Sequence, residues 1–157
     1  MSDIAKISLN PFWISGFLQA EGCFHVSFTK TSTKLGIEVR PSFSVTQPKK
    51  SVEILEHLKN YFECGSIRNS QKDHCKRYEV RSIADLVNKV LPHFEKHNLM
   101  FRKDEDLKLF KEICLLIHKN HHKNRESLAH IIEKAYKLNY GGRHKYEKET
   151  LLKLIAS

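Results

Sequence analysis

The sequence lacks most of the features that mark secreted, membrane-spanning or metal-clustering proteins. Its four cysteines, at positions 23, 64, 75 and 114, include no pair at C-x-x-C spacing. Neither a zinc site nor a disulfide framework is therefore indicated, and we interpret all four as reduced thiols. No apolar run approaches the length of a membrane span, and the first ten residues, MSDIAKISLN, lack the apolar core of a signal peptide. We therefore expect no membrane partner.

Acidic residues are also in short supply. The 157 residues include 18 Asp and Glu against 27 Lys and Arg, which gives a formal net charge of +9. A strongly basic chain favours a polyanionic partner, most often nucleic acid, over a small-molecule substrate. On charge alone, a merely basic soluble protein is an equally good interpretation. The length suits one domain with a hydrophobic core, spanning residues 1–157.

Residues 10–28 change from a helical to a strand pattern in their middle. Asn10 and Pro11 are typical of the start of a helix. From position 22 the sequence alternates strictly, with Phe24, Val26 and Phe28 apolar and the residues between them polar. The pattern predicts a helix that passes directly into a strand over roughly 22–30, with the carboxylate of Glu21 at the junction.

The rest of the chain predicts three more strands and several helices. Pro41 interrupts the second strand, so we expect an edge or a bulge there, and Pro92 should kink or end its helix. Further strands are expected at 37–46, 65–70 and 77–81, with the hairpin 71–76 between the last two, and helices at 48–62, 82–97, 103–118, 126–139 and 147–156. Strand pairs with helices on one face make an α+β domain.

The strand faces away from the helices are polar and basic. Guanidinium, hydroxyl and carboxylate groups match the donors and acceptors of base edges in a DNA major groove, although a plainly solvated sheet face is the simpler interpretation. Two lysines after the second strand are candidates for phosphate contacts or for a solvated helix start. The candidate DNA-binding residues are His25, Ser27, Thr29, Glu38, Arg40, Ser42, Ser44, Lys49, Lys50, Arg68, Ser70, Arg77, Glu79 and Arg81.

Residues 14–22, ISGFLQAEG, resemble the LAGLIDADG motif of homing endonucleases and related intron maturases. The family usually has an acid where Gln19 stands, whereas the acid that binds metal is kept as Glu21. The resemblance implies an αββαββα fold with a saddle-shaped, antiparallel four-stranded sheet and helices packed on one face. The likeness is strongest over 12–28, fair at 42–47 and 102–110, and weak in the hairpin and the tail.

The resemblance also implies a catalytic site. Glu21 would bind Mg²⁺ together with the neighbouring backbone carbonyl of Gly22, because hard cations take oxygen ligands; Mn²⁺ is possible, and Ca²⁺ would bind without supporting cleavage. Gln47 would orient the attacking water, unless it merely caps the turn beside Pro48. Lys103 would offset developing negative charge, unless it is a solvated helix-start lysine or Arg102 takes that place.

One copy of the motif is present, and single-motif family members act as homodimers. The resemblance therefore implies a symmetric dimer through the first helix, at Trp13, Gly16, Phe17 and Ala20, although Trp13 alone would suit a core equally well. Two protomers end to end would cover double-stranded DNA of about 20 base pairs. Half of a two-motif protein would look the same.

We therefore expect a Mg²⁺-dependent, site-specific DNA endonuclease that cuts a long pseudo-palindromic target and leaves short 3′ overhangs. The alternatives are a non-cleaving intron RNA maturase or DNA-binding module of the same fold, and a protein-interaction domain. A mitochondrial or chloroplast location is expected if the chain is encoded in an organellar intron, and a cytoplasmic one otherwise. The run from His118 to His122 does not indicate zinc, and 141–148 suits a phosphate contact or a surface loop equally.

Overall fold

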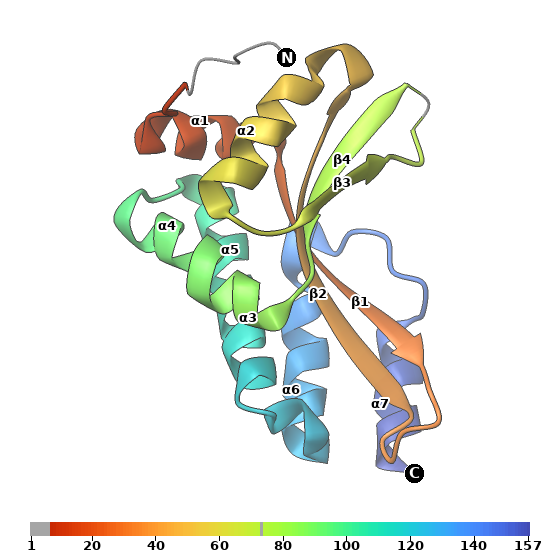
Figure 1. Ribbon diagram of the computed structural model, residues 1–157. Coiled ribbons are helices and arrows are strands. Elements are labelled where there is room, and N and C mark those ends of the chain that lie inside the picture. Colours follow the sequence, from red (N-terminus) through yellow and green to blue (C-terminus); the bar gives the residue numbers. More distant parts are fainter. Residues whose placement is uncertain (1–6, 73) are drawn as a thin grey trace.

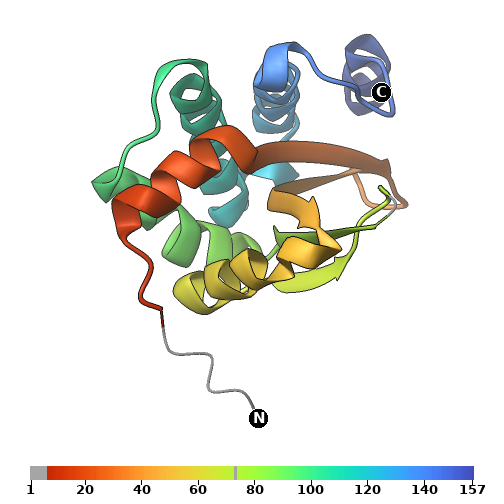
Figure 2. The ribbon, with the colours of Figure 1, turned by 90° about the horizontal axis from the view of Figure 1, so that it is seen from above.

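The computed structural model describes residues 7–72 and 74–157, so the first six residues and Asp73 of the predicted hairpin lie outside the described part. Helix α1 (Pro11–Glu21) runs straight into strand β1 (Gly22–Lys30), as the change of pattern predicts (Figures 1 and 2). The Asn10 side chain caps the helix by accepting a hydrogen bond from the Phe12 amide at 2.8 Å. A Cβ atom at Gly22 would lie 2.7 Å from the Leu18 carbonyl oxygen, so only glycine fits this junction.

The four strands form one antiparallel sheet. Its strands are β1, β2 (Ile37–Pro48), β3 (Ser66–Asn69) and β4 (Cys75–Val80), in the order β1-β2-β4-β3. Pro41 lies in β2 opposite Val26 of β1, whereas pairing with β4 begins only at Phe43. The predicted edge position of Pro41 is thereby confirmed, because its missing N–H is not needed there. Strand β2 also continues two residues further than predicted, which carries Gln47 into the sheet.

The helices follow the predicted order, with one bound corrected. Of the two effects expected of Pro92, it does not end the helix expected over 82–97, because a wider π-helical turn at Leu86–Val90 comes before it and the chain continues as α4 (Leu91–Lys96). The helix expected over 126–139 ends at Ala135, and a 3-10 turn at Leu138–Tyr140 follows, in which Asn139 and Tyr140 have positive φ. The remaining helices are α2 (Val52–Phe62), α3 (Ile83–Asp85), α4 (Leu91–Lys96), α5 (Phe101–His118), α6 (Arg125–Ala135) and α7 (Lys148–Ala156).

The hydrophobic core lies between the sheet and the helices. Figure 1 shows α1, α2, α4 and α5 on one side of the strands, and the segment that leads to α7 on the other side, beside β1. Phe24 is the centre of an aromatic cluster, with ring centroids 5.1 to 5.7 Å from those of Phe43, Phe94 and Phe110. Full burial of such a ring contributes about 2–3 kcal/mol. Within 7–72 and 74–157, no helix is both long and apolar enough to cross a membrane.

Candidate active site and nucleic-acid interface

Two side chains meet at the foot of α1. Glu21 is the last residue of that helix, and Gln47 lies near the end of β2. The Gln47 amide donates one hydrogen bond from Nε2 to Glu21 Oε2 at 2.9 Å and another to the carbonyl oxygen of Thr46, also at 2.9 Å. Glu21 is exposed, and its carboxylate forms no ion pair with any residue that the structure describes. A carboxylate in this state is available to a cation.

Lys103 approaches the same point from α5. It is the third residue of that helix, and its Nζ donates a hydrogen bond to the Gly22 carbonyl oxygen at 2.5 Å. Arg102 turns the other way: it donates to the Lys137 carbonyl at 2.8 Å and stacks on the ring of Tyr140. The structure therefore places Lys103, rather than Arg102, beside the acid.

A hollow of about 280 Å³ opens beside Glu21. Lys72 and Cys75 line it from the β3–β4 hairpin. No local pattern in the sequence indicates either residue, because their place follows from the pairing of Gln47 with Lys76. Its lining residues are Ala20, Glu21, Cys23, Ser44, Thr46, Gln47, Pro48, Lys72, Cys75 and Arg77. Burial raises the pKa of the Cys23 thiol, with the nearby Lys103 charge acting against it, so the structure offers no activated thiolate there.

The donors at the helix foot suit a hard cation. A carboxylate and an adjacent backbone carbonyl are oxygen ligands of the kind Mg²⁺ takes, with water and phosphate completing its shell. The Gly22 carbonyl accepts one hydrogen bond from Lys103 and keeps a second lone pair. Within residues 7–72 and 74–157, no group of three or more His, Cys, Asp or Glu is placed to hold a metal ion.

The open sheet face is less exposed than the sequence suggests. Ser42 and Ser44 alternate with the core residues of β2, yet they are only 6% and 3% exposed. Glu79 is also buried, and its carboxylate is paired with Arg68 and, at 3.6 Å, with Arg81. These three side chains therefore present little exposed surface on the sheet face, whereas Arg68 and Arg81 are about half exposed. Contact of the three residues with DNA stays a prediction.

The other candidate DNA-binding residues divide into two sets. His25, Ser27, Thr29, Glu38, Arg40, Arg68 and Arg77 lie in the strands, whereas Lys49, Lys50, Ser70 and Arg81 lie just beyond strand ends. Glu38 and Arg40 are exposed and form an ion pair at 2.8 Å. The Nε atom of Arg77 is buried and has no hydrogen-bond partner among the described residues.

The segment 141–147 lies against the outer strand of this face. The ring of His144 stacks on Tyr136 at 4.0 Å between centroids and lies 6.4 Å from the ring of His25. Burial, and then the neighbouring His144 and Arg77, lower the pKa of His25, and burial lowers that of His144. The segment therefore lies beside the polar sheet face, and its contact with DNA phosphate stays a prediction.

The predicted interface residues share one side of α1. Trp13 is 49% exposed, so a core position is excluded, and its ring stacks parallel to that of Phe17 at 5.4 Å. A Cβ atom at Gly16 would meet no described residue within 4 Å, and Ala20 is exposed one turn further on. Nothing in residues 7–72 and 74–157 therefore requires small residues at these two positions, which leaves room for a second backbone.

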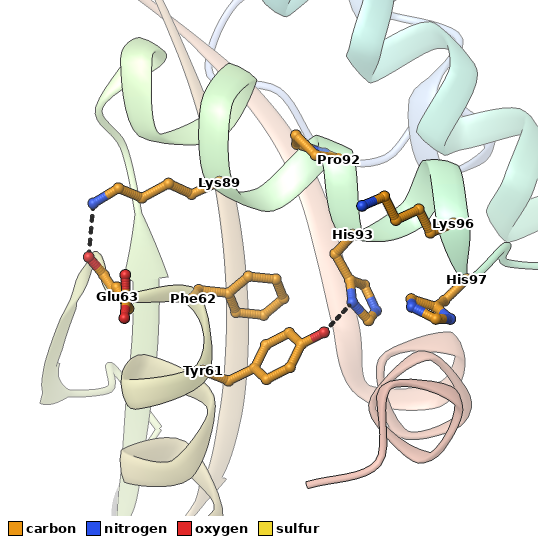
Figure 3. A pocket seen from close by; sticks show the side chains of 8 residues that line it. All are labelled: Tyr61, Phe62, Glu63, Lys89, Pro92, His93, Lys96 and His97. Carbon is orange, nitrogen blue, oxygen red and sulfur yellow. Dashed lines mark hydrogen bonds between the residues drawn. The ribbon is translucent and has the colours of Figure 1, made fainter. Parts of the chain in front are cut away.

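A second pocket, of about 390 Å³, lies away from the sheet face between α2 and α4 (Figure 3). The Tyr61 hydroxyl points to Nδ1 of His93 at 2.9 Å, and Nε2 of His93 lies 2.9 Å from the Ser15 hydroxyl. Ser15 donates its own proton to the His97 carbonyl, so His93 donates from Nε2 and accepts at Nδ1. Burial, and then His97, lower the pKa of His93 to about 4. The sequence alone did not reveal this brace between α1, α2 and α4.

Comparison with known proteins places these features in a family. A model described as "LAGLIDADG endonuclease" matches residues 14–114, which include Glu21, Gln47 and Lys103. A Neurospora crassa protein named "Probable intron-encoded endonuclease 2" is 36% identical over 135 residues, which are 85% of this chain and 30% of that protein. The chain thus spans less than a third of that relative's length.

Solved structures agree with this match. The homing endonuclease I-TnaI is 31% identical with a TM-score of 0.83, over 96% of this chain and 98% of that one. I-SmaMI bound to uncleaved DNA target in the presence of calcium ions is 34% identical with a TM-score of 0.85, over 96% of this chain and 50% of that one. The fold expected from the motif is confirmed, and the chain belongs to the LAGLIDADG endonuclease family.

Proposed function

We propose that this protein is a site-specific homing endonuclease that hydrolyses phosphodiester bonds in both strands of a long, pseudo-palindromic DNA target and leaves short 3′ overhangs. The contact between Gln47 and Glu21 carries the proposal. It holds an exposed, unpaired carboxylate in one orientation at the edge of an arginine-bearing sheet face. The names of the relatives, and the DNA in the I-SmaMI structure, support it.

Glu21 and the Gly22 carbonyl would hold Mg²⁺, which lowers the pKa of a bound water and stabilises charge on the scissile phosphate. Both N–H groups of the Gln47 amide are engaged, with Glu21 and with Thr46. Its amide oxygen is therefore the group that can accept a hydrogen bond and orient the attacking water. Lys103 donates one of its three N–H groups to the Gly22 carbonyl. The other two can donate to the negative charge that develops on phosphate.

Cutting two strands requires two such sites, and one chain supplies a single Glu21. In the proposed homodimer, the side of α1 with Trp13 and Gly16 meets its own copy, which brings two helix feet together. This protein covers half of the I-SmaMI chain, which supports a functional assembly of two such domains. Strand β1 has 9 residues, so two protomers end to end cover about 60 Å, or roughly 18 base pairs.

Selection from a randomised DNA library tests the proposal. Wild-type protein should enrich cut, nearly palindromic sites with Mg²⁺, and bound but uncut sites with Ca²⁺. Glu21→Gln should abolish cutting while the dissociation constant in Ca²⁺ stays within about threefold, since it removes a charge without changing shape. Glu56→Gln, at an exposed position of α2, is the matched control and should behave as wild type. Sites that are bound under both cations and never cut would favour a non-cleaving DNA-binding or maturase function instead.

A further inference from the structure

Gln19 makes a two-way contact with the start of α5. Its Nε2 donates to the Met100 carbonyl oxygen at 3.1 Å, and the Met100 amide donates to Gln19 Oε1 at 2.9 Å. Met100 is the residue that precedes α5, and its own side chain cannot cap the helix. The first amide groups of a helix need an acceptor from elsewhere. Gln19 supplies an acceptor at this point from a different helix, 81 residues away in the sequence.

The Gln19–Met100 contact is one of two links between the end of α1 and the start of α5. Three residues after Gln19 stands Gly22, and three residues after Met100 stands Lys103, whose Nζ donates to the Gly22 carbonyl. Hydrogen bonds therefore join the end of α1 to the first turn of α5 at two points, at Gln19 and at Gly22. Gln19 itself points to Met100 and makes no hydrogen bond with Glu21 or Gln47.

The first turn of α5 needs such a contact. Phe101, between Met100 and Lys103, has a φ of 54° and is 82% exposed. A bulky residue in the left-handed region is strained by about 1–2 kcal/mol. Because the ring is exposed, it gains too little packing against the described residues to offset this strain. The hydrogen bonds on either side of Phe101 must therefore hold the turn in place.

We propose that Gln19 is a positioning residue, which locks the first turn of α5 so that Lys103 reaches the helix foot. The inference rests on the proposed function, in which Lys103 faces the scissile phosphate. It also assigns a role to the glutamine that stands in the usual place of an acid. The requirement is an acceptor for the Met100 amide, which a carboxylate also provides; the amide of Gln19 adds a donor to the Met100 carbonyl.

A double-mutant cycle tests whether Gln19 acts through Lys103. Gln19→Met keeps the length of the side chain and removes both hydrogen bonds. It should slow single-turnover cleavage at saturating DNA by about 10- to 100-fold, the scale of a misplaced catalytic group, without changing the dissociation constant in Ca²⁺. Because the effect passes through Lys103, Gln19→Met combined with Lys103→Ala should cut no more slowly than Lys103→Ala alone. Multiplied losses in the double variant would overturn the proposal.

Chemical labelling tests the same point without cleavage. An amine-reactive reagent should acylate Lys103 several times faster in Gln19→Met than in wild type, because the Lys103 ammonium is then free of the Gly22 carbonyl. Gln19→Glu should restore the slow rate, and exposed Lys59 of α2 should react equally in all variants. Equal labelling of Lys103 in Gln19→Met and wild type overturns the proposal. If Gln19→Met does not fold, Gln19→Ala replaces it.

The two readouts separate this inference from the proposed function. If wild-type protein cuts no DNA, the proposed endonuclease function fails, but the labelling rates still decide whether Gln19 positions Lys103. If wild type cuts and Gln19→Met cuts equally well, the endonuclease stands and the positioning role is wrong.

Discussion

The ammonium group of Lys103 lies 2.5 Å from the carbonyl oxygen of Gly22, although 81 residues separate the two in the chain. The contact joins α5 to the point where α1 becomes β1. The lysine thus binds the backbone of the residue that follows Glu21, and it forms no ion pair with the Glu21 carboxylate. The site therefore keeps an anionic metal ligand and a cationic donor side by side.

Lys103→Met should lower the cleavage rate by about 100-fold, because it removes a donor aimed at developing negative charge. DNA affinity in Ca²⁺ should change little. Single-turnover cleavage at saturating DNA gives the first quantity, and fluorescence anisotropy gives the second. Lys59→Met removes the same charge at an exposed position of α2 and is the matched control. Equal loss in both variants would mean that only net charge matters.

Glu79→Gln should destabilise the fold by about 1–3 kcal/mol, because a buried carboxylate between Arg68 and Arg81 is replaced by a group that pairs less strongly. Urea unfolding measures this change. The substitution also releases two guanidinium groups toward the sheet face. The slope of log affinity for DNA against log salt should then steepen by about 1. An unchanged slope would show that these arginines do not face phosphate.

The stability of the fold should fall in mild acid because of His93. Its pKa is lowered to about 4, whereas an unfolded histidine titrates near 6.5. Between about pH 6.5 and pH 4, His93 is protonated in the unfolded chain but neutral in the folded chain. The free energy of unfolding therefore decreases as the pH falls from 6.5 to 4. The total is about 3 kcal/mol. At higher pH this residue contributes no pH dependence.

Urea unfolding at pH 7 and pH 5 checks the effect of His93. His93→Gln removes the titrating group, so the difference in unfolding free energy between the two pH values should shrink by about 2 kcal/mol. The variant will itself be less stable at pH 7, since the hydrogen bonds to Tyr61 and Ser15 are weakened. A pH dependence equal to that of wild type would mean that His93 is not the acid-sensitive group.

Two glycines of the motif should respond oppositely to alanine. Gly22→Ala places a Cβ atom 2.7 Å from the Leu18 carbonyl oxygen and should cost about 1–3 kcal/mol of folding free energy. Gly16→Ala meets nothing in the chain and should raise helix stability by up to about 1 kcal/mol, yet weaken the proposed dimer. Thermal melts measure the first effect and sedimentation velocity the second. A dimer that tolerates Gly16→Ala and Gly16→Leu would exclude this side of α1 as the interface.

Local patterns in the sequence predicted most of the secondary structure. The change from helical spacing to alternation placed the junction at Gly22, and strand β1 has the predicted bounds. The errors came where neighbours outweigh local preference. Strand β2 extends to Pro48 because β4 pairs with it there, and the helix expected to reach residue 139 ends at Ala135.

Exposure on the sheet face was not readable from alternation. Alternation assigns Ser42, Ser44 and Glu79 to the polar side correctly, but it does not reveal how deep each side chain lies. Depth depends on the length of the side chains around it and on partners such as Arg68, which comes from another strand.

The sequence by itself determined the motif, the carboxylate at the end of a helix and the basic character of the chain, because these follow from residue type and short-range spacing. The resemblance to a family pointed to Gln47 and Lys103 as site residues. Only the tertiary structure decided how these two residues contact Glu21 and Gly22. Those contacts join residues 26 and 81 positions apart. They depend on the register of β2 against β1 and on the docking of α5 by Gln19. Register and docking are set by the packing of the whole core, which no local stretch of sequence contains.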